Sequence, residues 1–210
     1  MRGMQIVNVR PDGFVFAESW REGIEALHYG FAELGIEIPV RENYFGPDAT
    51  QIVFGAHHLS EGVERKLPAD AILYNFEQLR EGYPWFQARY LALLQRFRVW
   101  DYSIRNIEYL RRSNTSPGAR HIPVGYVPQL IRVESIAQDI DVLFFGRLTD
   151  RRKRVLDGLI ESCVRLVRNP DARQTLADAG YKIITSPSRP MSAILGMLTE
   201  LQNRVAGRTN

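Results

Sequence analysis

The sequence predicts an α/β fold: a doubly wound parallel sheet with a partial, mostly helical C-terminal part. Short apolar runs alternate with amphipathic helical segments, which is the pattern of parallel strands joined by helices. After the apolar run at 140–145 only about sixty residues remain, whereas a complete second α/β domain needs roughly 100 or more. We therefore expect one full domain at 1–132 and a shortened second domain at 139–210.

The strands of the first domain are predicted from apolar runs at 4–9, 51–55, 71–75, 97–100 and 121–124. Between the first two runs, apolar side chains at intervals of four and three residues predict a helix, namely Trp20, Ile24, Leu27, Phe31 and Leu34. Ser19 and Glu22 form a capping box at its start, and Gly35 suits the left-handed residue after its end. Gly23 and Gly30 share one face, where they would let the helix lie close to the sheet.

Two more helices are expected in this domain. One begins at Pro84, a good first-turn residue, and the other follows Ser103. The second helix would carry Ile104, Ile107 and Leu110 inward. Strands that alternate with helices in this way favour a parallel sheet covered on both faces.

The C-terminal part follows a connector at 127–138. It comprises a strand at 140–145, helices at 149–167, at 170–180 and after Pro190, and a possible strand at 181–185. A sheet of two strands is marginal alone, so this part must pack on the first domain or on another chain. Self-association through the C-terminal helices is one such possibility, since the apolar residues Ile194, Leu198 and Leu201 would otherwise stay uncovered.

Composition restricts the class of protein. The chain is 45% hydrophobic with a net charge of +3, and its cations are spread along the sequence, so nucleic acid is not an expected partner. No apolar run approaches the roughly 18 residues of a membrane span. The single cysteine, Cys163, excludes an internal disulfide and a cysteine-built zinc site. We expect a globular cytoplasmic protein.

A candidate phosphate site lies where the strand at 140–145 ends. Gly146 and Arg147 form a turn, and Lys153 follows in the first turns of the next helix. Free backbone N–H groups at a helix start, together with cations, can hold a phosphate group. The alternative is a solvated first turn whose charges face water.

Candidate catalytic residues lie at or just past the ends of predicted strands: His57, Glu77 and Asp101. Such positions meet at the ligand-binding edge of a doubly wound sheet, where a carboxylate or imidazole could deprotonate a hydroxyl group. Helix capping or core hydrogen bonding is the alternative for each. A metal site is not expected, because His57 and His58 would point to opposite faces of a strand without a third ligand.

Most aromatic residues fall at strand or helix periodicity and should be core. Tyr83 and Trp85 are the exceptions, because they flank Pro84 in a loop and could line a groove for an acceptor.

Several segments in order resemble a bacterial glycosyltransferase family of the two-domain GT-B type. They are the segments 52–57, 73–78, 99–103, 106–108, 122–126, 141–146 and 151–153, and the likeness resumes at 167–180. The resemblance implies a Rossmann-like, GT-B N-terminal-type first domain that takes an acceptor. It also implies that Gly146, Arg147 and Lys153 contact the diphosphate of a nucleotide-sugar donor. The donor is a substrate, and no cofactor is implied.

The sequence departs from this family between Lys153 and residue 167. Related enzymes often carry two glutamates eight positions apart in the donor domain, whereas only Glu161 and Glu200 follow Gly146 here. Transfer needs the donor held between two domains, so we expect weak or no turnover by this chain alone. The alternative function is a non-catalytic module of the same ancestry that binds a glycan or a protein.

Overall fold

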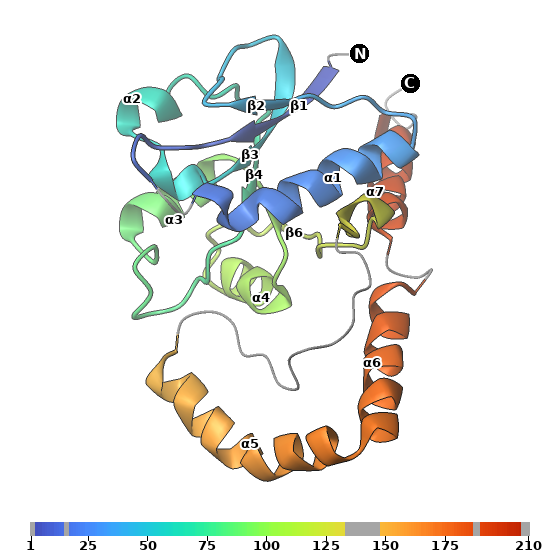
Figure 1. Ribbon diagram of the computed structural model, residues 1–210. Helices are drawn as coiled ribbons and strands as arrows, with labels where there is room; N and C mark the ends of the chain where they lie inside the picture. The colour runs from blue at the N-terminus through green and yellow to red at the C-terminus, as the bar shows by residue number, and fades with distance from the viewer. Residues whose placement is uncertain (1–2, 15–16, 133–147, 187–189, 207–210) are drawn as a thin grey trace. The chain divides into compact units, whose positions relative to one another are not determined.

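The computed structural model describes residues 3–14, 17–132, 148–186 and 190–206 (Figure 1). It divides into two compact units, of which the first comprises residues 1–131 and 188–210 and the second comprises residues 132–187. The C-terminal segment thus returns to the first unit, whereas the sequence suggested that all of 139–210 forms one body. No helix within the described ranges is long and apolar enough to cross a membrane.

The first unit is built on a six-stranded sheet in which all neighbouring strands are parallel. In order across the sheet the strands are β2 (Val40–Glu42), β1 (Gly3–Asn8), β3 (Ala49–Phe54), β4 (Ile72–Asn75), β5 (Arg98–Asp101) and β6 (Arg120–His121). The predicted parallel α/β sheet is confirmed. The chain leaves β1 toward β2 and returns on the other side of β1 as β3. The carboxyl ends of β1 and β3 therefore form the switch point at which such sheets bind ligands.

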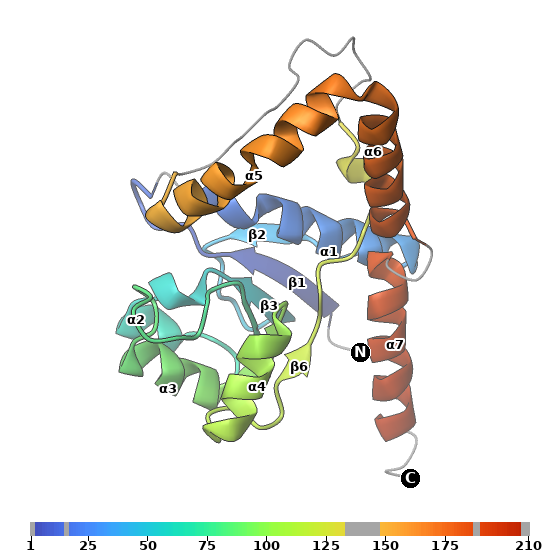
Figure 2. The same ribbon diagram turned by 90° about the horizontal axis from the view of Figure 1, so that it is seen from below.

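Helices cover both faces of this sheet. On one face lie α1 (Arg21–Glu33) and α7 (Met191–Ala206), which contact each other at a steep angle (Figures 1 and 2). On the other face lie α3 (Ala88–Arg96) and α4 (Ile104–Arg112), and the short α2 (Glu61–Glu64) follows β3. Short 3-10 turns complete the unit: η1 (Ala17–Trp20), η2 (Ala56–His58) and η3 (Pro128–Leu130).

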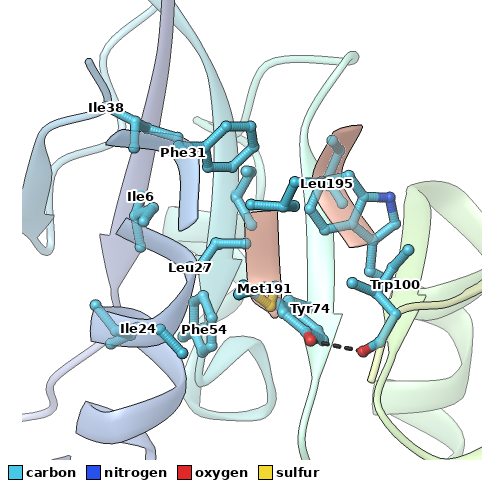
Figure 3. Close-up of a cluster of buried hydrophobic side chains, with 14 of the residues drawn as sticks. Ile6, Ile24, Leu27, Phe31, Ile38, Phe54, Tyr74, Trp100, Met191 and Leu195 are labelled. Carbon is cyan, nitrogen blue, oxygen red and sulfur yellow. Dashed lines mark hydrogen bonds between the residues drawn. The ribbon is translucent and has the colours of Figure 1, made fainter. Parts of the chain in front are cut away.

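Two hydrophobic cores result from the alternation of side chains along each strand. Ile6 packs in the core beneath α1 and α7, whereas its neighbour Val7 packs in the core beneath α3 and α4. In the first core, the buried Tyr74 hydroxyl donates to the Ile122 carbonyl oxygen over 2.6 Å (Figure 3). The polar end of this aromatic residue is thereby satisfied inside an apolar layer.

The ends of α1 agree only in part with the sequence. The expected capping box does not form, because η1 occupies those residues and the side chain of Trp20 at the N-cap accepts no capping hydrogen bond. The C-terminal end follows the prediction: Gly35 has a φ of 72° and donates to the Ala32 carbonyl oxygen, while Ile36 donates to that of Phe31. These two bonds form a Schellman motif, which needs a left-handed residue.

The last helix completes the core of the first unit. Met191 and Leu195 are buried against α1, and a Cβ atom at Gly30 would lie 2.7 Å from the Met191 Cγ. Gly30 therefore lets α1 lie close to α7 and not to the sheet. Gly23 lets α1 lie close to Phe76, which directly follows β4, and this agrees with the expected approach to the sheet.

The packing of α7 on α1 covers apolar residues that the sequence analysis expected to stay uncovered. Leu198 is buried and Ile194 packs against the same core, so neither needs a second chain to cover it. The side chain of Leu201 lies outside the described part. Self-association itself stays a prediction.

The second unit contains α5 (Asp150–Arg168) and α6 (Pro170–Ile184). Side-chain oxygens of Thr149 and Asn169 accept from backbone N–H groups in the first turns, so both helices are capped. None of the described side chains of this unit is buried. Since α6 continues past Gly180, the predicted strand at 181–185 is wrong. The predicted strand at 140–145 lies outside the described residues.

Other differences have local causes. Strand β2 was not predicted because its three residues are exposed and carry no apolar run. Ile104 is half exposed because it begins α4 and faces outward. Helix α3 starts at Ala88, since Pro84 lies in a preceding turn. Strand β6 is limited to Arg120–His121, one residue earlier than the predicted start.

Candidate functional site

Three predicted site residues lie at the same edge of the sheet. His57 lies in η2 just after β3, Glu77 follows β4, and Asp101 is the last residue of β5. These strands are neighbours and parallel, so their carboxyl ends meet at one edge. Their placement agrees with the sequence analysis, while the roles assigned to them stay predictions.

His57 and Glu77 form a close pair. The His57 Nε2 lies 3.5 Å from the Glu77 Oε1, and the two side chains are 4% and 21% exposed. Burial, together with the adjacent His58, lowers the pKa of His57 to about 3. Burial also raises the pKa of Glu77. At neutral pH His57 is therefore a neutral imidazole and a weak base, and the raised pKa makes the Glu77 carboxyl group the better proton acceptor of the pair.

The two histidines lie together and do not point to opposite faces. Their ring centroids are 4.0 Å apart. The expectation of opposite faces assumed a strand, but Gly55, with a φ of 74°, ends the strand and starts a 3-10 turn. Within the described ranges, no group of three His, Cys, Asp or Glu side chains could hold a metal ion.

Aromatic rings surround this histidine pair. The Trp85 ring lies 4.6 Å from His57 and 4.8 Å from His58, and Phe14 lies 4.3 Å from His58, measured between centroids. A cavity of about 20 Å³ beside His57 and Trp85 has room for one water molecule. Trp85 thus contacts the histidine pair, while its expected role in lining an acceptor groove stays a prediction. Tyr83 instead lies under the guanidinium of a neighbouring arginine.

Asp101 is fully buried in a polar network. Its carboxylate accepts from the Asn75 Nδ2 at 2.6 Å, the Ser103 backbone N at 2.7 Å and the Asn106 Nδ2 at 3.1 Å. Burial raises the pKa of Asp101 to about 6, against these hydrogen bonds, which lower it. Ser103 in turn caps α4. The geometry therefore favours the alternative of a local hydrogen-bond acceptor, since no face of Asp101 is open to a ligand.

A groove that the sequence analysis missed lies at the switch point. It has a volume of about 440 Å³ and is formed by the loops after β1, β2 and β3. Its polar lining consists of Arg10, Asp12, Asn43, His58, Ser60 and Lys66. A second hollow of about 470 Å³ shares several of these residues. The turn signal Pro11-Asp12-Gly13 directly after the first strand could have indicated this groove.

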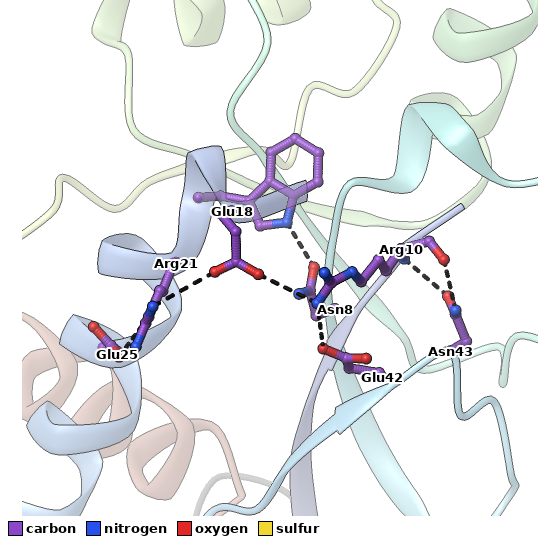
Figure 4. Close-up of polar contacts among 8 residues, drawn as sticks. Asn8, Arg10, Glu18, Arg21, Glu25, Glu42 and Asn43 are labelled. Carbon is purple, nitrogen blue, oxygen red and sulfur yellow. Dashed lines mark hydrogen bonds and ion pairs between the residues drawn. The ribbon is translucent and has the colours of Figure 1, made fainter. Parts of the chain in front are cut away.

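The wall of the groove is fixed by Arg10 and Asn43. The Asn43 side chain accepts from the Arg10 backbone N and donates to the Arg10 carbonyl oxygen, at 2.9 and 2.7 Å. The Arg10 guanidinium lies 3.2 Å from both Glu18 and Glu42 (Figure 4). This cation thus already faces two carboxylates of the chain itself. The lining itself holds the cations Arg10 and Lys66 and the carboxylate of Asp12, and of these Arg10 is already paired with Glu18 and Glu42.

The predicted phosphate site is described only in part. Gly146 and Arg147 lie outside the described residues. Lys153 is exposed on α5, where its backbone N donates to the Thr149 carbonyl oxygen. The candidate donor contacts therefore stay a prediction.

Comparisons with known proteins add no relative: no family model matches the chain, and neither a curated protein nor a solved structure matches it.

Proposed function

We propose that the chain is a glycosyltransferase-type protein whose first unit binds a hydroxyl-bearing acceptor in the switch-point groove. The observation that carries this proposal is the groove itself. Its volume of about 440 Å³ is within the usual range of roughly 300–1,000 Å³ for ligand sites. It also lies at the edge where doubly wound sheets bind ligands.

The charge of the groove favours a sugar-like ligand over a phosphate. The Arg10 guanidinium is shared by Glu18 and Glu42, which are not in the lining, and Asp12 is the carboxylate of the lining itself. A phosphate group would have to displace these carboxylates or lie beside them, and like charges repel. Hydroxyl groups of a ligand can donate to the Asp12 carboxylate and accept from Lys66, so an uncharged, hydroxyl-rich ligand suits this surface.

The His57–Glu77 pair supports a role in proton removal. An acceptor hydroxyl must lose its proton when it attacks a donor sugar, and the Glu77 carboxylate, whose pKa burial raises, is the candidate base with His57 beside it. The pair lies next to His58, which lines the groove. The donor diphosphate would be held by Gly146, Arg147 and Lys153, as the resemblance implies. Because the donor half is short, we expect weak or no turnover by this chain alone.

Calorimetry tests the acceptor site. Oligosaccharides should bind the purified chain, and Asp12→Ala should weaken binding about tenfold because a hydrogen bond to a carboxylate is lost. Glu37→Ala is the control, since this exposed residue precedes β2 at the opposite edge of the sheet. If no saccharide binds, or if both variants weaken binding equally, the acceptor proposal is wrong.

Nucleotide binding distinguishes a glycosyltransferase from the alternative of a non-catalytic binding module. Diphosphate-dependent binding of a nucleotide that is lost in Arg147→Ala would support the glycosyltransferase lineage. Binding of glycans without any response to nucleotides would instead favour a non-catalytic glycan-binding or protein-binding module. Nucleotide release from UDP-, GDP- or TDP-sugars at ordinary enzymatic rates would contradict the expected inactivity of the chain alone.

A further inference from the structure

The loop that carries Glu77 is held by two buried asparagines. Asn75, at the end of β4, accepts from the Glu77 backbone N at 3.0 Å and donates to the Glu77 carbonyl oxygen at 2.9 Å. Asn106, on α4, donates to the same carbonyl oxygen at 2.8 Å. Both asparagines are almost fully buried. Hydrogen bonds from β4 and α4, two elements that are distant from each other in sequence, thus hold the Glu77 backbone.

Asn106 also holds the far end of this loop. Its Oδ1 accepts from the Leu79 backbone N at 3.1 Å, so one side chain bonds both Glu77 and Leu79. The amide can do this only in one orientation, with its NH₂ group toward the Glu77 carbonyl oxygen and its oxygen toward the Leu79 N–H group.

Asp101 fixes that orientation. An ionised carboxylate only accepts hydrogen bonds, so the NH₂ groups of both asparagines must turn toward it. The Asn106 Nδ2 lies 3.2 and 3.1 Å from the two Asp101 oxygens, and the Asn75 Nδ2 lies 2.6 Å from one of them. The Tyr90 hydroxyl then donates to the Asn75 Oδ1 at 2.8 Å. A flipped amide would place NH₂ groups against other donors.

We propose that Asn106 is a positioning residue that holds Glu77 opposite His57, with Asp101 setting the direction of its amide. This inference rests on the proposed function, because it assigns the role of Asn106 within the candidate proton-transfer pair. Asn106 does not contact the ligand groove. It acts through the Glu77 backbone, whose position decides whether the carboxylate lies 3.5 Å from the His57 Nε2.

The test is a nitrogen NMR spectrum of the His57 ring in the full chain without any ligand. A carboxylate beside Nε2 favours the tautomer with the proton on Nε2. Wild type should show this tautomer, and Asn106→Ala should shift the ring to a mixture of tautomers. Glu77→Gln is the direct reference for loss of the carboxylate. The carboxyl carbon of Glu77 gives a second readout: its raised pKa should fall toward the ordinary value in Asn106→Ala.

Ser103→Ala is the matched control. It removes the cap of the same helix and so weakens α4 without removing a bond to Glu77. The inference is supported if the His57 and Glu77 signals change in Asn106→Ala but not in Ser103→Ala. It is overturned if both variants change them equally, or if Asn106→Ala changes neither. Should Asn106→Ala fail to fold, Asn106→Ser keeps a hydroxyl donor near Asp101 and is read in the same way. Because no ligand is present, failure of the acceptor proposal would not affect this result.

Discussion

The two units of this chain carry similar helices but stabilise them differently. In the first unit the apolar stripes of α1, α3, α4 and α7 are buried against the sheet or against each other. In the second unit α5 and α6 have good caps, yet none of their described side chains is buried. Most helical stability in proteins comes from the packing of an apolar face. The comparison teaches that clear helix signals in a sequence do not indicate how strongly the helix is held.

The largest expected effect is the difference in unfolding free energy between alanine substitutions at two leucines. Leu94 on α3 is fully buried, whereas Leu176 on α6 is 60% exposed. Leu94→Ala should lower the free energy of unfolding by about 2–5 kcal/mol, because it leaves a cavity. Leu176→Ala should change it by less than about 0.5 kcal/mol. Urea unfolding followed by tryptophan fluorescence measures both. Equal losses would show that α6 packs as tightly as α3.

The second largest expected effect is a dependence of stability on pH, because His57 and Asp101 are both buried in the first unit and have shifted pKa values. The pKa of His57 is lowered to about 3, so the unfolded chain binds a proton that the folded chain does not. Stability therefore falls as the pH falls below about 6.5, by about 3 kcal/mol near pH 4. The pKa of Asp101 is raised to about 6. Protonation of this group stabilises the fold as the pH falls from about 6 to 4, by about 2 kcal/mol.

These opposing contributions should largely cancel in the wild type. His57→Phe keeps an aromatic ring against Trp85 but removes the titration, so its stability should rise by about 3 kcal/mol between about pH 6 and pH 4 relative to wild type. Urea unfolding of both proteins at several pH values measures this difference. Parallel profiles would mean that the imidazole is accessible to protons in the folded state.

The smallest expected effect compares two helix caps. Thr149 caps α5 and Ser103 caps α4 through the same kind of side-chain bond. Each alanine substitution should weaken its helix by about 1 kcal/mol. Only Ser103→Ala should lower the stability of the first unit, while Thr149→Ala should speed hydrogen exchange within α5 alone. A lower unfolding midpoint of the first unit in Thr149→Ala would show that the two units unfold together.

Sequence reasoning located one half of the candidate site and missed the other. His57 and Glu77 were found because they follow apolar strands, and the ends of parallel strands meet at one edge. The groove was missed because it depends on β2, an exposed strand without an apolar run, and on the bonds between Asn43 and Arg10. Residues 33 apart in sequence make those bonds, so no local pattern predicts them.

The sequence by itself determined the parallel α/β architecture, most strand positions and the left-handed turn at Gly35, because apolar periodicity and glycine conformation act over a few residues. Only the tertiary structure decided that Asp101 is an internal acceptor, that Asn106 bonds the Glu77 loop and that α7 returns to pack on α1. These outcomes depend on burial and on hydrogen bonds between distant segments. Their energies arise only when the sheet and its helices have come together.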